Sequence, residues 1–135
     1  MSIDRQGLAA AARAAAAASY SPYSRFRVGA ALLCEDGSIV TGANVENRSY
    51  GLTLCAERTA AAAAVSSGRR SFLAVAVCTP DSAEAVAPCG ACRQVLSEFA
   101  GPQTPVLMSG SRDSRECTLG ELYPWDSLHD LKGKR

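Results

Sequence analysis

The sequence predicts an α/β sandwich built on a mixed β-sheet. Two apolar runs separated by a short turn indicate an antiparallel hairpin in the N-terminal third of the chain. After this hairpin, helix-forming runs alternate with strand-like runs, which is typical of strands linked by helical crossovers. The 135 residues are enough for one hydrophobic core, and we expect a single domain over residues 1–135.

The N-terminal part of the chain is expected to be a helix followed by the hairpin. Asp4 is a suitable N-cap for an alanine-rich helix that continues to about Ser19. Strands are expected at residues 27–34 and 38–43, and Glu35-Asp36-Gly37 between them is a hairpin turn signal. The hairpin then supplies the antiparallel part of the sheet.

Two further helices are expected in the middle of the chain. Residues 53–65 are rich in strong helix formers, and Gly68 follows where a helix would stop. Pro88 is expected to open the next helix, since its missing N–H has no partner at a helix start, and this helix ends near Gly101 and Pro102.

The remaining segments predict strands and one short helix. Strands are expected at residues 72–79 and 104–109, with a polar loop at 80–87. A turn-rich loop at 110–115 would lead into a short edge strand and a helix from Thr118, and residues 133–135 are expected to fray.

Charge and hydropathy restrict the partners that the protein can have. The net charge is +1 and no basic stripe is present, so we expect no nucleic-acid partner. No apolar run reaches membrane-spanning length, so we expect no membrane partner. The alanine-rich segment 8–18 is unlike a signal peptide because Asp4 precedes it and Arg13 interrupts it. These features favour a cytoplasmic protein.

A cysteine pattern carries the chemistry. Cys55-Ala56-Glu57 is followed, after residues 58–87, by Pro88-Cys89-Gly90-Ala91-Cys92. A catalytic zinc site takes three protein ligands and keeps the fourth position for water, and this pattern is that of zinc deaminases. A fourth protein ligand is not obvious: His129 lies in the polar tail, and the other thiols are scattered singly at Cys34, Cys78 and Cys117.

The surroundings of the three thiols favour the thiolate form. Cys55 and Glu57 are expected in the first turn of one helix, and Cys89 and Cys92, three apart, on one face of the next. Helix N-termini lower the pKa of nearby thiols. Arg58 and Arg93 each directly follow a motif residue, so they could donate to the sulfurs and offset their negative charge. Alternatively, both arginines are solvated on the surface.

Other interpretations of the cysteines explain less of the sequence. A C-x-x-C pair could be a thioredoxin-like redox site, but this leaves Cys55 and Glu57 unexplained. The six cysteines could form three disulfides, but these need an oxidising compartment and nothing in the sequence supports export. Buried thiols are expected at the three remaining positions, Cys34, Cys78 and Cys117.

The chain resembles the small, homotetrameric, zinc-dependent cytidine deaminases over nearly its whole length. The resemblance lies in residues 21–32 (SPYSRFRVGAAL), 44–47 (NVEN), 50–51 (YG), 55–60 (CAERTA) and 88–94 (PCGACRQ). It implies a three-layer αβα sandwich with a mixed sheet of about five strands. It also implies a homotetramer with sites at subunit interfaces and one Zn²⁺ per subunit, held by Cys55, Cys89 and Cys92.

The same resemblance implies roles for residues that would otherwise be assigned to the core or to turns. Phe26 would pack against the pyrimidine, and Asn44 and Glu46 would bind the ribose 3′-hydroxyl. The backbone N–H of Ala56 would meet the base O2, and the carbonyl of Ala87 would meet the amino group.

The implied reaction is hydrolytic deamination of cytidine and 2′-deoxycytidine in pyrimidine salvage. Zinc-bound hydroxide would attack C4, with Glu57 as the proton shuttle. The same chemistry on a nucleoside antibiotic of the blasticidin S kind, or on a modified cytidine, is the alternative. A polynucleotide editor fits poorly because aromatic and basic residues are not interleaved, and a non-catalytic zinc module would give Glu57 no role.

Two positions depart from the family pattern and bear on substrate range. Arg48 stands in a loop where a small residue is usual and where the family borders a neighbouring subunit's substrate. Leu128 takes the place of a phenylalanine that stacks on the base bound by another subunit. Trp125 could substitute for that phenylalanine or could anchor the C-terminal tail.

Overall fold

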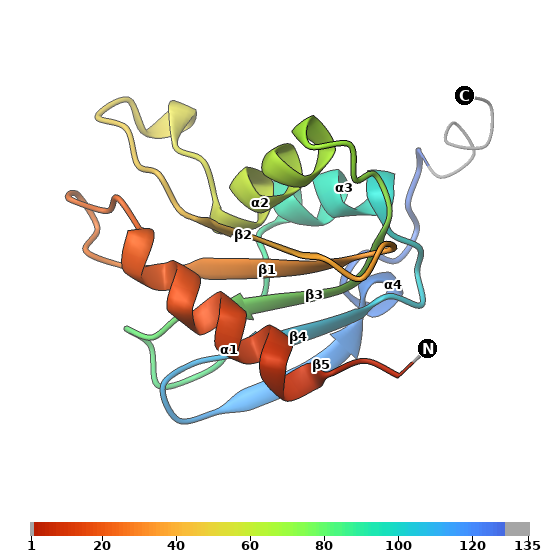
Figure 1. Ribbon diagram of the computed structural model, residues 1–135. Helices are drawn as coiled ribbons and strands as arrows, with labels where there is room; N and C mark the ends of the chain where they lie inside the picture. The colour runs from red at the N-terminus through yellow and green to blue at the C-terminus, as the bar shows by residue number, and fades with distance from the viewer. Residues whose placement is uncertain (1, 129–135) are drawn as a thin grey trace.

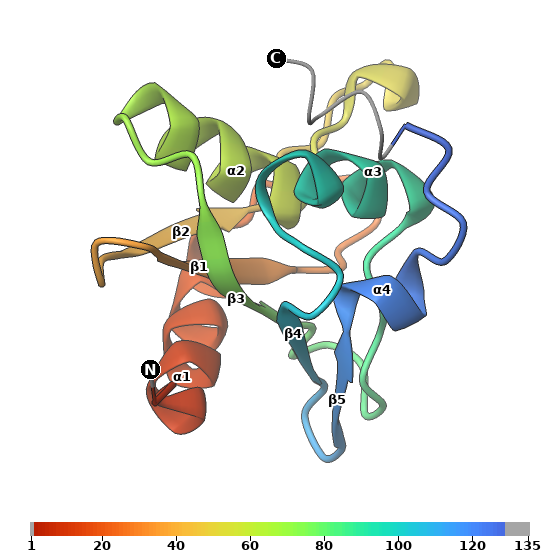
Figure 2. The ribbon, with the colours of Figure 1, turned by 90° about the vertical axis from the view of Figure 1, so that its right-hand side faces the viewer.

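The computed structural model describes residues 2–128 as one mixed sheet with helices on both faces (Figures 1 and 2). The sheet has five strands in the order β2-β1-β3-β4-β5; β3 and β4 are parallel and the other neighbours antiparallel. The elements are α1 (Arg5–Ala15), a 3₁₀ turn (Ala16–Ala18), β1 (Gly29–Cys34), β2 (Ile39–Ala43), a 3₁₀ turn (Tyr50–Leu52), α2 (Ala56–Ser66), β3 (Phe72–Cys78), α3 (Gly90–Phe99), β4 (Pro105–Ser109), β5 (Ser114–Thr118) and α4 (Leu119–Leu122). The three-layer αβα sandwich is confirmed.

The first layer is α1, which lies across β1 and β3. The Asp4 side chain accepts from Gly7 N at 2.9 Å and caps the helix as expected. The regular α-helix ends at Ala15, short of Ser19, and a 3₁₀ turn completes the run. Alanines on this face of the sheet and Gly29 let the helix approach closely: a β-carbon at Gly29 would lie 2.0 Å from a helix carbonyl.

The opposite face of the sheet is covered by α2 and α3, which lie beside each other (Figure 2). Larger side chains fill this side, with Leu32 of β1, Val75 of β3 and Leu96 of α3 fully buried. Successive residues of a strand point to opposite faces, so β1 and β3 serve both cores with alternate positions. This core fixes the N-termini of α2 and α3 at one end of the sheet.

The hairpin and the C-terminal elements follow the expected chemistry. Gly37 has a φ of 86°, a left-handed conformation that glycine adopts readily, and its N–H donates to Cys34 O. Thr118 and Glu121 form a capping box at the start of α4. The expected fraying of residues 133–135 lies outside the described residues, as does His129. Among the helices of residues 2–128, none is long and apolar enough to cross a bilayer.

Candidate metal and substrate site

Three cysteine sulfurs come together where α2 and α3 begin. Cys55 is the N-cap of α2, Cys89 is the N-cap of α3, and Cys92 lies in the first turn of α3. The Cys89 Sγ lies 3.7 Å from the Cys55 Sγ and 3.4 Å from the Cys92 Sγ, and all three atoms lie within 4.8 Å of one another. Both helices begin later than expected: α2 begins at Ala56 and not at residue 53, so Cys55 precedes its first turn, and α3 begins at Gly90, so Pro88 precedes the N-cap instead of opening the helix.

This arrangement fits one zinc ion. When sulfurs bind one tetrahedral zinc ion at Zn–S distances of about 2.3 Å, they lie slightly less than 4 Å from one another. The sulfur–sulfur distances of 3.4 and 3.7 Å found here are close to this value. All six cysteines are free thiols, so the three-disulfide alternative is wrong. Cys34 and Cys78 are buried and Cys117 is half-buried, and none of these three belongs to the cluster.

Cys55 is a thiolate before any metal binds. A hydrogen bond with the Cys92 thiol, with a second from Arg58, lowers the pKa of Cys55 to about 5. The pKa of Cys92 is raised, first because of its hydrogen bond with Cys55 and then because of burial. One proton is therefore held back at Cys92 while Cys55 is ionised at neutral pH, which is the form that zinc binds.

Arg58 and Arg93 have different structural roles. Arg58 Nη2 lies 3.4 Å from Cys55 Sγ, and interactions with Cys55 and Cys92 raise its pKa. Its Nε is buried and has no hydrogen-bond partner among residues 2–128, so this donor also favours anionic sulfur nearby. Arg93 instead donates to backbone carbonyls, at 2.8 Å to Pro88 O and 2.7 Å to Leu122 O. Neither alternative considered for Arg93 is found: within residues 2–128 it makes no hydrogen bond to a sulfur, and its half-buried side chain ties α3 to the last residue of α4.

Glu57 lies beside the cluster in the first turn of α2 and is only 4% exposed. Burial raises its pKa to about 7, because a carboxylate loses its hydration there. A carboxyl group with a pKa near neutrality can both accept and return a proton, which is what a proton shuttle needs.

A cavity of about 170 Å³ opens next to these groups. Its walls include Phe26, Asn44, Ala56, Glu57 and Ala87, together with two of the three thiols, Cys55 and Cys89. The structure thus brings together five of the expected substrate and catalytic residues, from segments up to sixty-one residues apart in sequence. Five further wall residues were not among those expected at the site, and they come from strand ends and loops: Val28, Thr53, Val77, Thr79 and Val86.

Asn44 uses most of its hydrogen-bonding capacity to hold the segment around Phe26. Its Oδ1 accepts from Val28 N at 3.0 Å and from Ser19 Oγ, and its Nδ2 donates to Phe26 O at 2.9 Å. One amide N–H is left over. Asn44 is therefore both a wall of the cavity and the support of the opposite wall.

Glu46 is buried beside the cavity and is not one of its wall residues. Its Oε1 accepts from the N–H groups of Tyr23 and Ser24, and its Oε2 accepts from the Ser24 hydroxyl. The Ser24 hydroxyl bond is the main cause of a lowered Glu46 pKa. Ser24 also accepts from Phe26 N at 3.0 Å, so it is a site residue that the sequence did not identify.

The residues that depart from the family pattern lie on the surface. Trp125 is 96% exposed and has a φ of 57°, so it does not anchor the tail within residues 2–128. Leu128 and Arg48 are also exposed. None of the three lines the cavity of this single chain.

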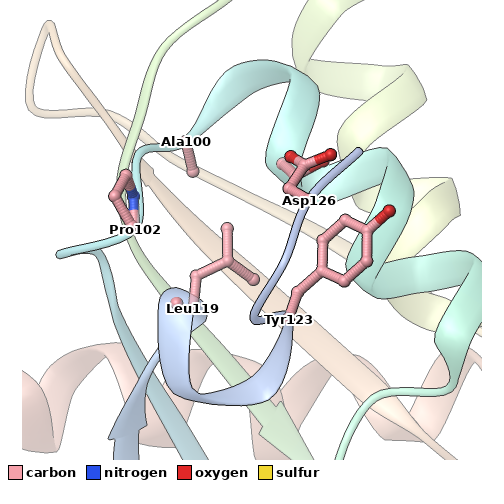
Figure 3. Close-up of a pocket in the computed structure, with 7 residues that line it drawn as sticks. Ala100, Pro102, Leu119, Tyr123 and Asp126 are labelled. Carbon is pink, nitrogen blue, oxygen red and sulfur yellow. The ribbon is translucent and has the colours of Figure 1, made fainter. Parts of the chain in front are cut away.

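A second, smaller cavity of about 40 Å³ lies where α3 ends and α4 begins (Figure 3). Ala100, Pro102, Leu119 and Tyr123 form its mainly apolar walls, and Asp126 lies at its edge. The Tyr123 hydroxyl is already bonded to Gln94 Oε1. This cavity contains no metal-ligand cluster and is a packing gap beside α4.

Comparison with known proteins agrees with this geometry. Residues 1–108 match the model of the cytidine and deoxycytidylate deaminase zinc-binding region. A cytidine deaminase of Halalkalibacterium halodurans is 52% identical over 123 residues, covering 90% of this chain and 92% of the relative. The crystal structure of cytidine deaminase from Burkholderia pseudomallei superposes with a TM-score of 0.86 at 44% identity, over 91% of this chain and 98% of that one.

A more distant relative has a different name. It is a blasticidin-S deaminase of Bacillus cereus, 35% identical over 108 residues, which cover 75% of this chain and 76% of the relative. The matched family region, the identity to its members and the three-cysteine cluster agree with one another. The chain belongs to the cytidine and deoxycytidylate deaminase family of zinc-dependent hydrolytic deaminases.

Proposed function

We propose that this protein hydrolyses cytidine and 2′-deoxycytidine to uridine and 2′-deoxyuridine, with release of ammonia. One observation carries the proposal: the thiols of Cys55 and Cys89 and the carboxyl group of Glu57 line the same small cavity. Its volume of about 170 Å³ is below the roughly 300–1,000 Å³ of sites that enclose a whole drug-sized ligand. A single pyrimidine ring inside, with its sugar toward the rim, suits this size.

We assign the metal to Cys55, Cys89 and Cys92, one zinc per subunit. Bound zinc lowers the pKa of a water molecule and so supplies a nucleophile near neutral pH. Glu57 is the group that moves protons. Its carboxylate takes a proton from the attacking water, delivers it to N3 of the ring, and later transfers a proton to the departing amine. One water is consumed and one ammonia is released.

The base is recognised by one aromatic side chain and two backbone groups. Phe26 packs against the pyrimidine and excludes water from it. Ala56 is the first residue of α2, where backbone N–H groups have no intrahelical partner, and its N–H is free to meet the base O2. The carbonyl of Ala87, on the loop before α3, accepts a hydrogen bond from the amino group of cytosine. The oxygen at the same position of uracil has no hydrogen to donate, so this contact favours the substrate over the product.

Asn44 and Glu46 bind the ribose 3′-hydroxyl. Each retains unused capacity: Asn44 has one amide N–H, and the Glu46 carboxylate accepts three hydrogen bonds and can accept another. A hydroxyl can accept from the first and donate to the second. An ionised carboxylate repels a phosphate, so this pair favours a free nucleoside over a 3′-linked polynucleotide.

We further propose a homotetramer with sites at subunit interfaces. Several large apolar side chains are exposed near the site entrance, and a cluster of this kind is typical of an interface. These residues are Tyr20, Tyr23, Val45, Tyr50, Leu52 and Leu54. A single domain over residues 1–135, a cytoplasmic location and a role in pyrimidine salvage complete the proposal.

The experiment is turnover of cytidine, 2′-deoxycytidine and blasticidin S by the zinc-loaded protein, followed by ammonia release. Turnover of the two simple nucleosides is expected. If only blasticidin S or a modified cytidine is deaminated, the substrate assignment is wrong while the reaction type stands. Arg48 would then be the first residue to replace, because it lies exposed in the 46–54 loop.

A further inference from the structure

We propose that Arg27 and Asp81 form a clamp that sets the width of the substrate cavity by joining its two walls. They are positioning residues, since neither lines the cavity. Part of the inference rests on the proposed function, because it takes a pyrimidine nucleoside to be the ligand of this cavity.

The first wall is the segment that enters β1. Arg27 lies between Phe26 and Val28, both of which line the cavity. Asn44 holds the two neighbours of Arg27 through Phe26 O and Val28 N. Arg27 itself makes three hydrogen bonds with Asp81: from its N–H at 2.8 Å, from Nε at 3.1 Å and from Nη2 at 2.7 Å.

The second wall is the loop that leaves β3 and carries Thr79, Val86 and Ala87 into the cavity. Its first half is fixed to the β4–β5 turn by backbone hydrogen bonds, with Ser82 O accepting from Ser111 N at 2.7 Å and Ala83 O from two further N–H groups. Asp81 lies in this fixed half and can therefore hold Arg27 in place.

The clamp begins where strand pairing stops. The β1–β3 ladder ends at Gly29 and Cys78, and beyond them the chains separate to form the cavity walls. Continuing the register would place Arg27 opposite Pro80, which has no N–H to donate. The ladder therefore lacks a donor for the Arg27 carbonyl. The Arg27 N–H donates to the Asp81 carboxylate, so a side chain joins the two chains where strand pairing has ended.

No other ion pair found in residues 2–128 joins these two walls. The side chains of Arg27 and Asp81 are 50% and 27% exposed, and exposed pairs contribute little to global stability. Loss of the pair is therefore expected to loosen the cavity and to leave the fold intact.

The test compares Asp81→Ala and Arg27→Gln in the zinc-loaded enzyme with two control variants. Arg5 and Glu116 form a similarly exposed pair, with bonds of 2.8 and 3.0 Å, between α1 and β5, away from the cavity. Glu116→Ala and Arg5→Gln thus remove an equivalent pair. For Asp81→Ala we expect the KM for cytidine to rise about fivefold, equivalent to about 1 kcal/mol, with kcat within about twofold of wild type.

The double variant R27Q/D81A is expected to have the same KM for cytidine as D81A, because the two substitutions remove the same interaction. Cytidine is uncharged at neutral pH, so the effect of salt on its KM reports on charges of the protein. The wild-type KM should rise between about 0.05 and 0.5 M salt and the D81A value should stay flat. An unchanged KM in D81A, or an equal rise in E116A, would overturn the clamp.

Hydrogen exchange tests the clamp without any substrate. Amides of residues 24–28 should exchange faster in the zinc-loaded D81A enzyme than in wild type or E116A, because local opening becomes easier. Unchanged exchange there would also overturn the inference. If wild type fails to turn over cytidine while D81A exchanges faster, the substrate proposal is wrong and the clamp stands.

Discussion

The Arg58 guanidinium lies 3.4 Å from the Cys55 sulfur, and the two residues sit on either side of the start of α2. The hydrogen bond from Arg58 is one cause of the lowered Cys55 pKa, after the hydrogen bond with Cys92. Three thiolates around a dication leave an excess of negative charge. A cation at this distance offsets part of that charge and favours metal binding.

Arg58→Met should therefore weaken zinc binding while preserving most of the side-chain volume. Loss of the guanidinium raises the Cys55 pKa, and supporting residues of this kind are typically worth about 10–100-fold in metal affinity or activity. Competition with a chromophoric chelator at pH 7 measures the affinity. Arg69→Met is a matched control, because Arg69 bonds Asp36 and Ser67 beyond the other end of α2. Equal affinities for the two variants would contradict the role of Arg58.

Zinc binding at pH 7 should release fewer than three protons from the sulfurs. The Cys55 pKa is lowered to about 5, so its thiolate is present at pH 7 and is lost as the pH falls through about 5. Calorimetry of the metal-free protein in buffers of different ionisation enthalpy counts the protons. A larger count is expected for Arg58→Met than for wild type. The same ionisation predicts that a chelator strips zinc faster at pH 5 than at pH 7.

Glu57→Gln should keep zinc and lose turnover. The amide has the shape of the carboxyl group but cannot shuttle a proton, and proton transfer of this kind contributes about 10²–10⁴-fold to the rate. Zinc content by mass spectrometry and ammonia release are measured on the same preparation. A variant with full zinc and wild-type turnover would remove Glu57 from the mechanism.

Cys89→Ala should lose the metal, because it removes one of three clustered sulfurs. The melting temperature of the variant should fall toward that of metal-free wild type, since a ligand that binds only the folded state adds its binding free energy to stability. Cys117→Ala is the control, because Cys117 lies outside the cluster. Full zinc content in Cys89→Ala would show that another group completes the site.

Local sequence chemistry predicted most of the fold because each signal acts over a few residues. The Asp4 cap, the turn at Gly37 and the Thr118 helix start all depend on neighbours within about one turn of helix. The starts of α2 and α3 were expected at residue 53 and at Pro88, three and two residues too early. Cys55 and Cys89 have the extended backbone of N-cap residues, and composition does not show which residue takes that position.

Contacts between distant segments could not be predicted in the same way. Arg93 follows Cys92, so a hydrogen bond to the sulfurs and a solvated position were both open, but it donates to Leu122 O, twenty-nine residues away. Arg27 and Asp81 are fifty-four residues apart; Arg27 lies in the 21–32 segment of the resemblance and Asp81 in no motif, and neither had an expected role. The position of such partners depends on how β1 and β3 end, which requires the folded sheet. The motif residues could be identified from the sequence because thiols and a carboxyl group at this spacing indicate a zinc site without any knowledge of their contacts.

A substitution at Gly42 distinguishes a loss of activity caused at the site from a loss caused by lower overall stability. A β-carbon there would lie 2.4 Å from Ala60 N, in the helix that carries Glu57, whereas one at Gly29 would collide with α1 on the opposite face. Backbone atoms cannot move as a side-chain tip does, so Gly42→Ala pushes α2 outward and Gly29→Ala pushes α1. Both variants should melt lower, with overpacking of this kind costing about 1–3 kcal/mol.

Only Gly42→Ala should also lower kcat and zinc affinity, because it displaces the helix that begins at the metal cluster. Melting temperature, zinc content and ammonia release are compared for the two variants at a temperature where both are folded. Gly101→Ala is the control, since a β-carbon at Gly101 meets nothing within 4 Å. Equal losses of kcat in Gly42→Ala and Gly29→Ala would mean that activity follows overall stability and not the seating of α2.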